Sequence, residues 1–239
     1  MKDLRACYEA GPTGYVLYWQ LTQLGVACEV IAPSLVPTKA GDRVKTDRRD
    51  AEKLARCYRA GELTAVWVPD AAHEALRDLV RAREAAKKDQ LKARHRLGKF
   101  LLRHGQRRPE GIRAWTQKHR EWIKGHVRFE QPALEATLAD YLEEVDHAGS
   151  RITKLDKAID EALRQAPREI REVVEALQAL RGVAQTVAVS IVAEVGSLSR
   201  FPSPRELMGY SGLVPSEYSS GNRVQRGELP RPATDISGG

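Results

Sequence analysis

Residues 41–51 read GDRVKTDRRDA and place two carboxylates three residues apart at the predicted start of a helix. Thr46 is a favoured N-cap residue, and the apolar residues after it recur at helical spacing. Side chains at i and i+3 share a helix face, so Asp47 and Asp50 can point at one spot. At about 4 Å and an effective dielectric constant of about 20 the two charges repel by roughly 4 kcal/mol, and a divalent cation between them would reverse this cost. Asp47 and Asp50 are therefore candidate Mg²⁺ ligands.

The same two aspartates also fit an interpretation without a metal. Asp is favoured in the first turn of a helix because it interacts with the positive end of the helix dipole. Arg48 and Arg49 lie between the two acids and could neutralise them. Both interpretations stay open on these residues alone.

The composition favours a protein that folds in water and binds an anionic partner. Its 239 residues are 42% hydrophobic, enough for the core of one large domain or two ordinary ones. Lys and Arg number 39 against 32 Asp and Glu, a net charge of +7, which favours nucleic acid. Three cysteines without CxxC spacing argue against a disulfide scaffold or a zinc site. With neither an apolar run of about 20 residues nor a signal-peptide pattern, we expect a cytoplasmic location and no membrane partner.

The first 70 residues alternate between strand and helix patterns. Strands are predicted over 4–9, 26–34 and 64–68, and helices over 15–24 and from Asp47 onward. A βαβα order is typical of an α/β domain with a parallel sheet.

Two long helices are predicted over 71–103 and 133–165, joined by a Gly, Pro and Arg-rich reversing segment. We expect them to form an antiparallel coiled coil. Trp115 and Trp122, seven residues apart in the connection, are interpreted as a packing pair on a helix. The apolar stripe of the first helix comprises Leu76, Leu79, Val80, Ala86, Leu91, Leu97, Leu101 and Leu102, and that of the second Leu134, Leu138, Leu142, Val145, Ile152, Leu155, Ile159 and Leu163.

The first long helix also has a basic side, which is either a solvated face or a surface that contacts phosphates. Its members are Arg77, Arg81, Arg83, Lys87, Lys88, Lys92, Arg94, Arg96 and Lys99.

After Pro167 two shorter helices are predicted on either side of the segment GVAQ. This pattern indicates a helix-hairpin-helix, whose hairpin amides can hold a phosphate, or else a plain pair of antiparallel helices. The segment consists of Gly182, Val183, Ala184 and Gln185.

Four runs together resemble the DEDD transposases of bacterial insertion sequences. They are CYEAGPTGY, GDRVKTDRRDAEKLA, GELTAVWVPD and LRGVAQTVAVSIVAEVGSLSRFPSPRELMGYSGLVPSEYSSG, and the resemblance covers about residues 6–227. It implies an RNase H-like (RuvC-like) domain whose acids hold Mg²⁺, a coiled coil, and a C-terminal domain that supplies a serine nucleophile.

The resemblance assigns roles to residues of this chain. Glu9 matches the second acid of the family, and Asp47 and Asp50 match the third and fourth. Ser220 matches the nucleophile, with Ser219 as the alternative. Contacts to nucleic acid are expected from the GVAQ segment and from Arg48, Arg49, Arg223 and Arg226.

The expected architecture is α/β plus α, in four parts. Residues 1–70 form a partial RuvC-like domain without its first strands, 71–165 the coiled coil, 166–227 the C-terminal domain with the helix-hairpin-helix, and 228–239 a disordered tail. Compared with the family, the first metal-binding Asp and the C-terminal helix rich in Arg are not found. We therefore expect a chain truncated at both ends and inactive in recombination.

Three functions compete at this point. The first is a DNA recombinase, in which Mg²⁺ positions a phosphodiester and Ser220 attacks phosphorus. The second is a nucleic-acid-binding remnant without chemistry, and the third is a Holliday-junction-type nuclease that uses metal-activated water. The expected partners are DNA, a structured guide RNA of the element, and further copies of the chain in a dimer or tetramer.

Overall fold

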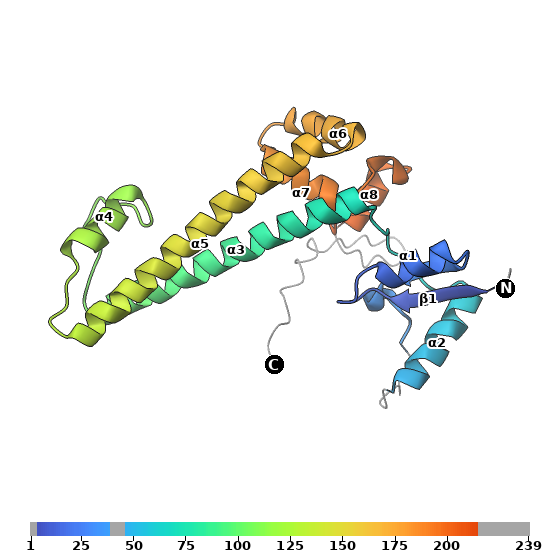
Figure 1. The fold of residues 1–239 in the computed structure, drawn as a ribbon, viewed down its shortest axis with the longest axis horizontal. Helices are drawn as coiled ribbons and strands as arrows, with labels where there is room; N and C mark the ends of the chain where they lie inside the picture. Colours follow the sequence, from blue (N-terminus) through green and yellow to red (C-terminus); the bar gives the residue numbers. More distant parts are fainter. Residues whose placement is uncertain (1–3, 39–45, 215–239) are drawn as a thin grey trace, which may run out of the picture. The chain divides into compact units, whose positions relative to one another are not determined.

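The computed structural model describes residues 4–38 and 46–214 of the chain. It divides into two compact units, Met1–Ala71 and Ala72–Gly239, which are described separately (Figure 1). Across these described ranges, no helix combines the length and the apolar character that a membrane span requires.

The first unit is built on a strand-helix-strand motif. Strand β1 (Arg5–Glu9) is followed by helix α1 (Val16–Gln23) and strand β2 (Ala27–Ile31). The two strands pair in parallel, with Cys7 opposite Glu29. Parallel strands need a crossover connection, which α1 supplies, so the predicted parallel arrangement is confirmed for these two strands.

A third extended segment lies on the other side of β2. Ala65 forms an antiparallel bridge with Ile31, and the amide of Val66 donates to the carbonyl of Val30 at 2.8 Å. The predicted strand over 64–68 is therefore reduced to a bridge, and it runs antiparallel. The predicted strand over 26–34 ends at Ile31, because Pro33 cannot donate to a ladder and begins a 3₁₀ turn, η1 (Pro33–Leu35).

Helix α2 (Asp47–Ala60) completes this unit and is attached near its C-terminal end. The Tyr58 hydroxyl donates to Oε1 of Glu29 on β2 at 3.1 Å. Burial, and next this hydrogen bond, raise the pKa of Tyr58. Val30 and Ile31 are buried in the unit, but no residue of α2 is.

The second unit is organised by two long helices, α3 (Ala71–Arg103) and α5 (Pro132–Gln165). Three ion pairs connect them: Arg83 with Asp156, Asp89 with Arg151 and Arg96 with Glu144. Successive residues of α3 pair with progressively earlier residues of α5, so the helices run antiparallel (Figure 1). The regular supercoiling of a coiled coil stays a prediction.

Charge and side-chain size both favour this pairing. Helix α3 carries ten Lys and Arg against four Asp and Glu, whereas α5 carries eight Asp and Glu against four Lys and Arg. Small residues, Ala86 and Ala148, are buried near the middle of the pair. A Cβ at Gly149 would lie 3.2 Å from Nε2 of Gln90 on α3, tighter than most contacts, so the helices approach closely here.

One apolar core forms where α3 ends and α5 begins, against helix α4 (Gln117–His126). Trp115 and Trp122 pack against it, which confirms their predicted packing role, but only Trp122 lies on the helix. Trp115 precedes the helix with a φ of 63°, a left-handed conformation that is uncommon for a residue with a side chain. The buried members of this core are Ala93, Leu97, Phe100, Leu101, Ile123, Val127, Leu138 and Val145.

The predicted apolar stripe of α3 needs correction at two positions. Leu91 and Leu102 are 54% and 65% exposed, whereas Ala93 and Phe100, which the stripe omitted, are buried. Helix α3 packs against different neighbours at its two ends, so no single stripe of regular spacing is buried along its whole length.

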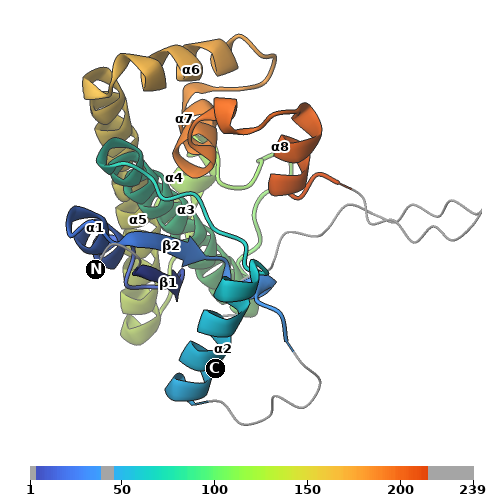
Figure 2. The same cartoon turned by 90° about the vertical axis from the view of Figure 1, so that its right-hand side faces the viewer.

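A second core joins the other ends of α3 and α5 to helices α6 (Arg168–Gln178) and α7 (Gln185–Val195). After a 3₁₀ turn, η2 (Leu198–Arg200), helix α8 (Pro204–Tyr210) returns to α7, where the Tyr210 hydroxyl donates to the carbonyl of Glu194 at 3.4 Å. Figure 2 shows α6, α7 and α8 in this unit. Helix α8 was not predicted from the sequence.

A buried histidine shapes the chain around α4. His119 is only 6% exposed, and its Nδ1 accepts a hydrogen bond from the Trp115 amide at 3.1 Å. Its ring also stacks on Trp122. Burial, and next the positive charge of Arg108, lower the pKa of His119. The neutral imidazole is therefore the form that the fold requires.

We expect Leu97→Ala to lower the free energy of unfolding by about 2–5 kcal/mol, because it opens a cavity at a side chain with no exposed surface. The measurement is urea denaturation followed by the helical circular dichroism signal. Leu91→Ala on the same helix is the matched control and should change stability by less than about 0.5 kcal/mol. Equal losses in the two variants would contradict the assigned core.

We expect His119 to make stability depend on pH. Its folded pKa lies below the ordinary value of 6.5, so the unfolded chain binds the proton more tightly. Neutral His119 makes its full contribution to the free energy of unfolding above pH 6.5. That contribution is lost as the pH falls through the folded pKa, by at most about 1.4 kcal/mol per pH unit. When the pH is lowered from about 7.5 to about 5.5, the urea midpoint should fall less in His119→Gln than in the natural chain. His126→Gln, at an exposed position, should behave as the natural chain does.

Candidate functional site

The two predicted metal-binding aspartates lie where the sequence places them, in the first turn of α2. Thr46 caps the helix: its backbone is extended, and its Oγ1 accepts a hydrogen bond from the Arg49 amide at 3.3 Å. Asp47 and Asp50 are both exposed. The predicted N-cap and helix start are thus confirmed, and the two carboxylates are accessible from solvent.

The two arginines between the acids do not neutralise them in this structure. Arg48 turns along the helix and pairs with Glu52, with 3.2 Å between Nε and Oε1. Within residues 4–38 and 46–214, neither aspartate forms an ion pair. Mg²⁺ is commonly held by one or two protein carboxylates together with waters and substrate phosphates. Asp47 and Asp50 could therefore supply the protein carboxylates of such a site, with waters and a substrate phosphate as the other ligands.

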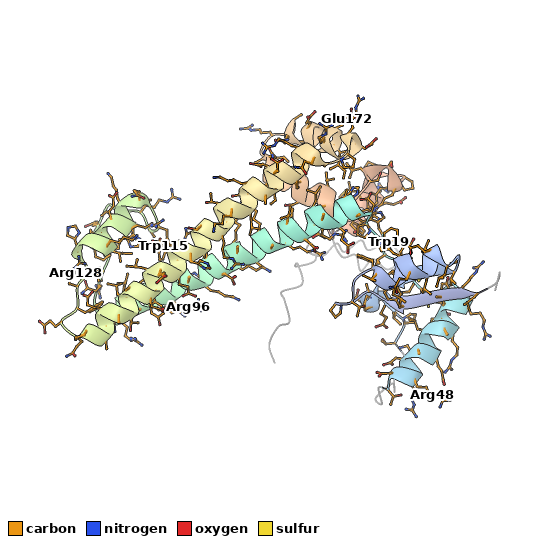
Figure 3. The ribbon with its side chains drawn as sticks, in the orientation of Figure 1. Trp19, Arg48, Arg96, Trp115, Arg128 and Glu172 are labelled. Carbon is orange, nitrogen blue, oxygen red and sulfur yellow. The ribbon has the colours of Figure 1, made fainter. Side chains whose placement is uncertain are left out.

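The third predicted ligand, Glu9, is exposed at the C-terminal end of β1. Over the part of the chain that the structure describes, no three His, Cys, Asp or Glu side chains are grouped so that they could hold a metal ion. Glu9 is therefore not brought together with Asp47 and Asp50. The attachment of α2 explains this, because Asp47 lies eleven residues, or about 16 Å along the helix, from Tyr58. In Figure 3, Arg48 marks the end of α2 that is remote from the strands.

Several other predicted site residues lie outside the described residues. They are Ser219, Ser220, Arg223 and Arg226. Residues 41–45 of the stretch that contains the aspartates lie outside as well.

The GVAQ segment joins α6 and α7, which pack against each other in one core. Gly182 has a φ of 88°, so it occupies the left-handed position that turns the chain. Gln185 donates from Nε2 to Oδ1 of Asp160 on α5 at 2.9 Å, a contact that the sequence did not indicate. The antiparallel helix pair is present, and phosphate binding by Gly182, Val183, Ala184 and Gln185 stays a prediction.

Much of the predicted basic side of α3 is engaged inside the protein. Arg77 is buried and donates from Nε to the carbonyl of Ala193 at 3.1 Å, at the C-terminal end of α7. Arg81 binds both carboxylate oxygens of Glu194, at 2.7 and 2.8 Å. Arg83 and Arg96 pair with α5, as described above, and the Arg94 guanidinium lies over the Trp115 ring, 5.4 Å from its centroid. Exposed lysines, Lys87, Lys88, Lys92 and Lys99, make up the rest.

Two family models match this chain. Residues 5–105 match the DEDD transposase model of IS110 type, described as a transposase. Residues 174–234 match the model described as "Transposase IS116/IS110/IS902 family". The first match contains Glu9, Asp47 and Asp50, and the second contains the GVAQ segment and Ser220.

The chain is also similar to curated transposases. A putative transposase y4qE of Sinorhizobium fredii is 49% identical over 220 residues, which are 92% of this chain and 52% of that protein. The transposase for insertion sequence element IS1533 of Leptospira borgpetersenii is 35% identical over 210 residues, 87% of this chain and 60% of that protein. A probable family 20 transposase of Pseudomonas aeruginosa is 28% identical over 229 residues, 91% of this chain and 64% of that protein. The chain thus spans between about half and two thirds of the length of these relatives.

We expect Thr46→Ala to loosen the turn that carries the aspartates, since an N-cap hydroxyl contributes about 1 kcal/mol and α2 buries no side chain. Amide hydrogen exchange in the first two turns of α2 should become about fivefold faster. Thr46→Ser keeps the hydroxyl and should exchange like the natural chain. Unchanged exchange in Thr46→Ala would contradict the cap's role.

Proposed function

This chain belongs to the IS110 family of DEDD transposases, and we propose that it is part of an enzyme that cuts and rejoins DNA at an insertion sequence. The observation that carries the proposal is the pair of exposed carboxylates, Asp47 and Asp50, in a capped helix turn, where neither forms an ion pair with a described residue. The pair lies in the region that matches the DEDD model. Transposition by the whole protein is the activity that this assignment supports.

We assign the acids to a divalent cation, Mg²⁺ in this proposal, because DEDD transposases are generally metal-dependent. Asp47 and Asp50 would supply two carboxylates on one helix face. Glu9 is the third acid that the family resemblance assigns, although the described residues do not group it with the two aspartates. The cation would contribute positive charge that polarises a DNA phosphodiester. The two aspartates would hold that charge in place, because a cation between them relieves their mutual repulsion.

Ser220 is the proposed nucleophile. Its Oγ forms a bond to phosphorus while a phosphodiester P–O bond breaks, so one DNA end becomes a serine phosphoester and the other leaves as a hydroxyl. A serine hydroxyl is a poor nucleophile at neutral pH unless it is activated and its target phosphate is positioned. Ser219 is the alternative residue.

The partners follow from the same assignment. DNA is the substrate, and a structured RNA of the element is the proposed guide. Rearrangement of two DNA ends favours a dimer or tetramer of the chain. Contacts to nucleic acid are proposed for the GVAQ segment and for Arg48, Arg49, Arg223 and Arg226.

A second candidate is a nucleic-acid-binding role without chemistry for these 239 residues alone. The observation that favours it is that the described residues group no three acids around a possible metal position. The two candidates differ in whether a covalent protein–DNA product forms.

The experiment uses this chain in two forms: by itself, and joined to the segments by which the Sinorhizobium fredii relative extends beyond the match. Each form is incubated with DNA that carries the sequences flanking the reading frame, with Mg²⁺ or with EDTA. A phosphoserine–DNA adduct is then sought on denaturing gels. We expect an adduct from the extended form with Mg²⁺ only, and none from the chain by itself.

Variants of the extended form test the assigned residues. Ser220→Ala should abolish the adduct, and Ser219→Ala is the matched control that should keep it. Asp47→Asn and Asp50→Asn should each lower the yield about 100-fold, because loss of a carboxylate ligand weakens binding of the cation. An adduct that survives Ser220→Ala would refute the nucleophile, and Mg²⁺-dependent cutting without any adduct would indicate the nuclease instead.

A further inference from the structure

The segment between the two long helices forms a small lobe, residues 104–130, which contains α4. It carries seven Lys and Arg against three Asp and Glu. No residue of this lobe is among those that the sequence predicts to bind nucleic acid. Its charge is nevertheless less compensated than that of α3.

Four of its seven cations have no partner among the residues that the structure describes. Arg107, Arg108, Arg113 and Lys118 are exposed, and within the described ranges none of them forms an ion pair or a side-chain hydrogen bond. The other three are held by the protein: Arg120 and Lys124 pair with Asp146, and Arg128 donates to the carbonyls of Lys124 and Val127.

The four free cations belong to one end of α4. Lys118 lies in its first turn, and the carbonyl of Arg113 accepts hydrogen bonds from the amide and the hydroxyl of the N-cap residue Thr116. Arg108 is close enough to lower the pKa of His119, in the same turn, and Arg107 is its neighbour in the chain. Of the nearby acids, Glu121 accepts a hydrogen bond from Gln117, and Glu110 is exposed.

The base that carries these cations is well packed. Ile123 and Val127 have no exposed surface, and His119 is fixed between Trp115 and Trp122. In Figure 3, Trp115 and Arg128 mark the lobe at one end of the helix pair. A charged surface on a packed base needs little ordering when a partner binds.

We propose that the exposed surface formed by Arg107, Arg108, Arg113 and Lys118 binds the phosphate backbone of double-stranded DNA. The four cations come from separate positions along residues 107–118, which suits a row of phosphates better than a single small anion. Both tryptophans of the lobe pack against its core, so they are not available to stack on bases. Binding is therefore independent of DNA sequence. The choice of DNA as the nucleic acid rests on the proposed function.

The test is the affinity of the 239-residue chain for a duplex DNA of arbitrary sequence, measured by fluorescence anisotropy over about 50–200 mM salt. One variant replaces Arg107, Arg108, Arg113 and Lys118 with Gln. The matched control replaces Lys154, Lys157, Arg171 and Arg205 with Gln, which changes the net charge equally at exposed positions elsewhere in the same unit. Circular dichroism verifies that both variants keep their helices.

We expect the lobe variant to lose about 100-fold in affinity near 100 mM salt and its salt slope to shrink by about 3 to 4, close to one per phosphate contact. The control should lose less than about threefold, since charges remote from the DNA act weakly through salt. Equal losses in the two variants, or no DNA binding by the natural chain, would overturn the proposal. Tighter binding to duplex RNA than to duplex DNA would overturn the choice of partner. The lobe variant could lose DNA affinity as expected while the extended form yields no protein–DNA adduct. That combination would contradict the proposed chemistry and would support the DNA-binding surface.

Discussion

The second unit depends on the contact between α3 and α5. Neither helix can bury its apolar stripe alone, and each end of the pair needs a further element to close it. Helix α4 closes one end around Leu97 and Ile123, and α6 and α7 close the other around Ile159 and Val189. The opposite net charges of α3 and α5 add to this contact, although exposed ion pairs individually contribute only about 0.2–1 kcal/mol. Apolar burial at the two ends therefore supplies most of the stability, and the charges determine which faces meet.

The same pairing explains why the basic side of α3 is a poorer candidate for binding DNA than its composition indicated. Arg83 and Arg96 face carboxylates of α5, and Arg77 and Arg81 hold the end of α7. A cation that already has a carboxylate partner gains less from a phosphate, because the first partner must be given up. The lobe around α4 differs because its four exposed cations have no such competitor in the described part of the chain.

Much of this architecture could be predicted from the sequence. Helix α3 has the predicted bounds, because its length and regular composition leave no competing pattern, and Thr46 marks the start of α2. Helix α8 was missed, since seven residues are too few to show a period. The exposed Leu91 was misassigned, because a helix that packs against different neighbours along its length has no single buried stripe.

The candidate site could be predicted only locally. The positions of Asp47 and Asp50 in a capped first turn follow from neighbouring residues, and these are confirmed. The distance from Glu9 depends on how α2 attaches to the strands, and the Tyr58 contact with Glu29 that determines it joins residues 29 positions apart. No local pattern encodes such a contact. Likewise, the partners of Arg77 and Arg81 lie more than 100 residues further along the chain.

The order of the ion pairs along α3 and α5 also protects the alignment of the two helices. If α5 moved by seven residues in one direction, its apolar positions would still face α3, but Arg96 would then meet Arg151 instead of Glu144. Movement by seven residues in the other direction would bring Asp89 against Glu144. Either shift replaces an attraction by a repulsion, in the way that flanking charges select the alignment of paired helices. The hairpin therefore has one favoured register, and the lobe at its tip is held at a defined distance from the core formed by α6 and α7.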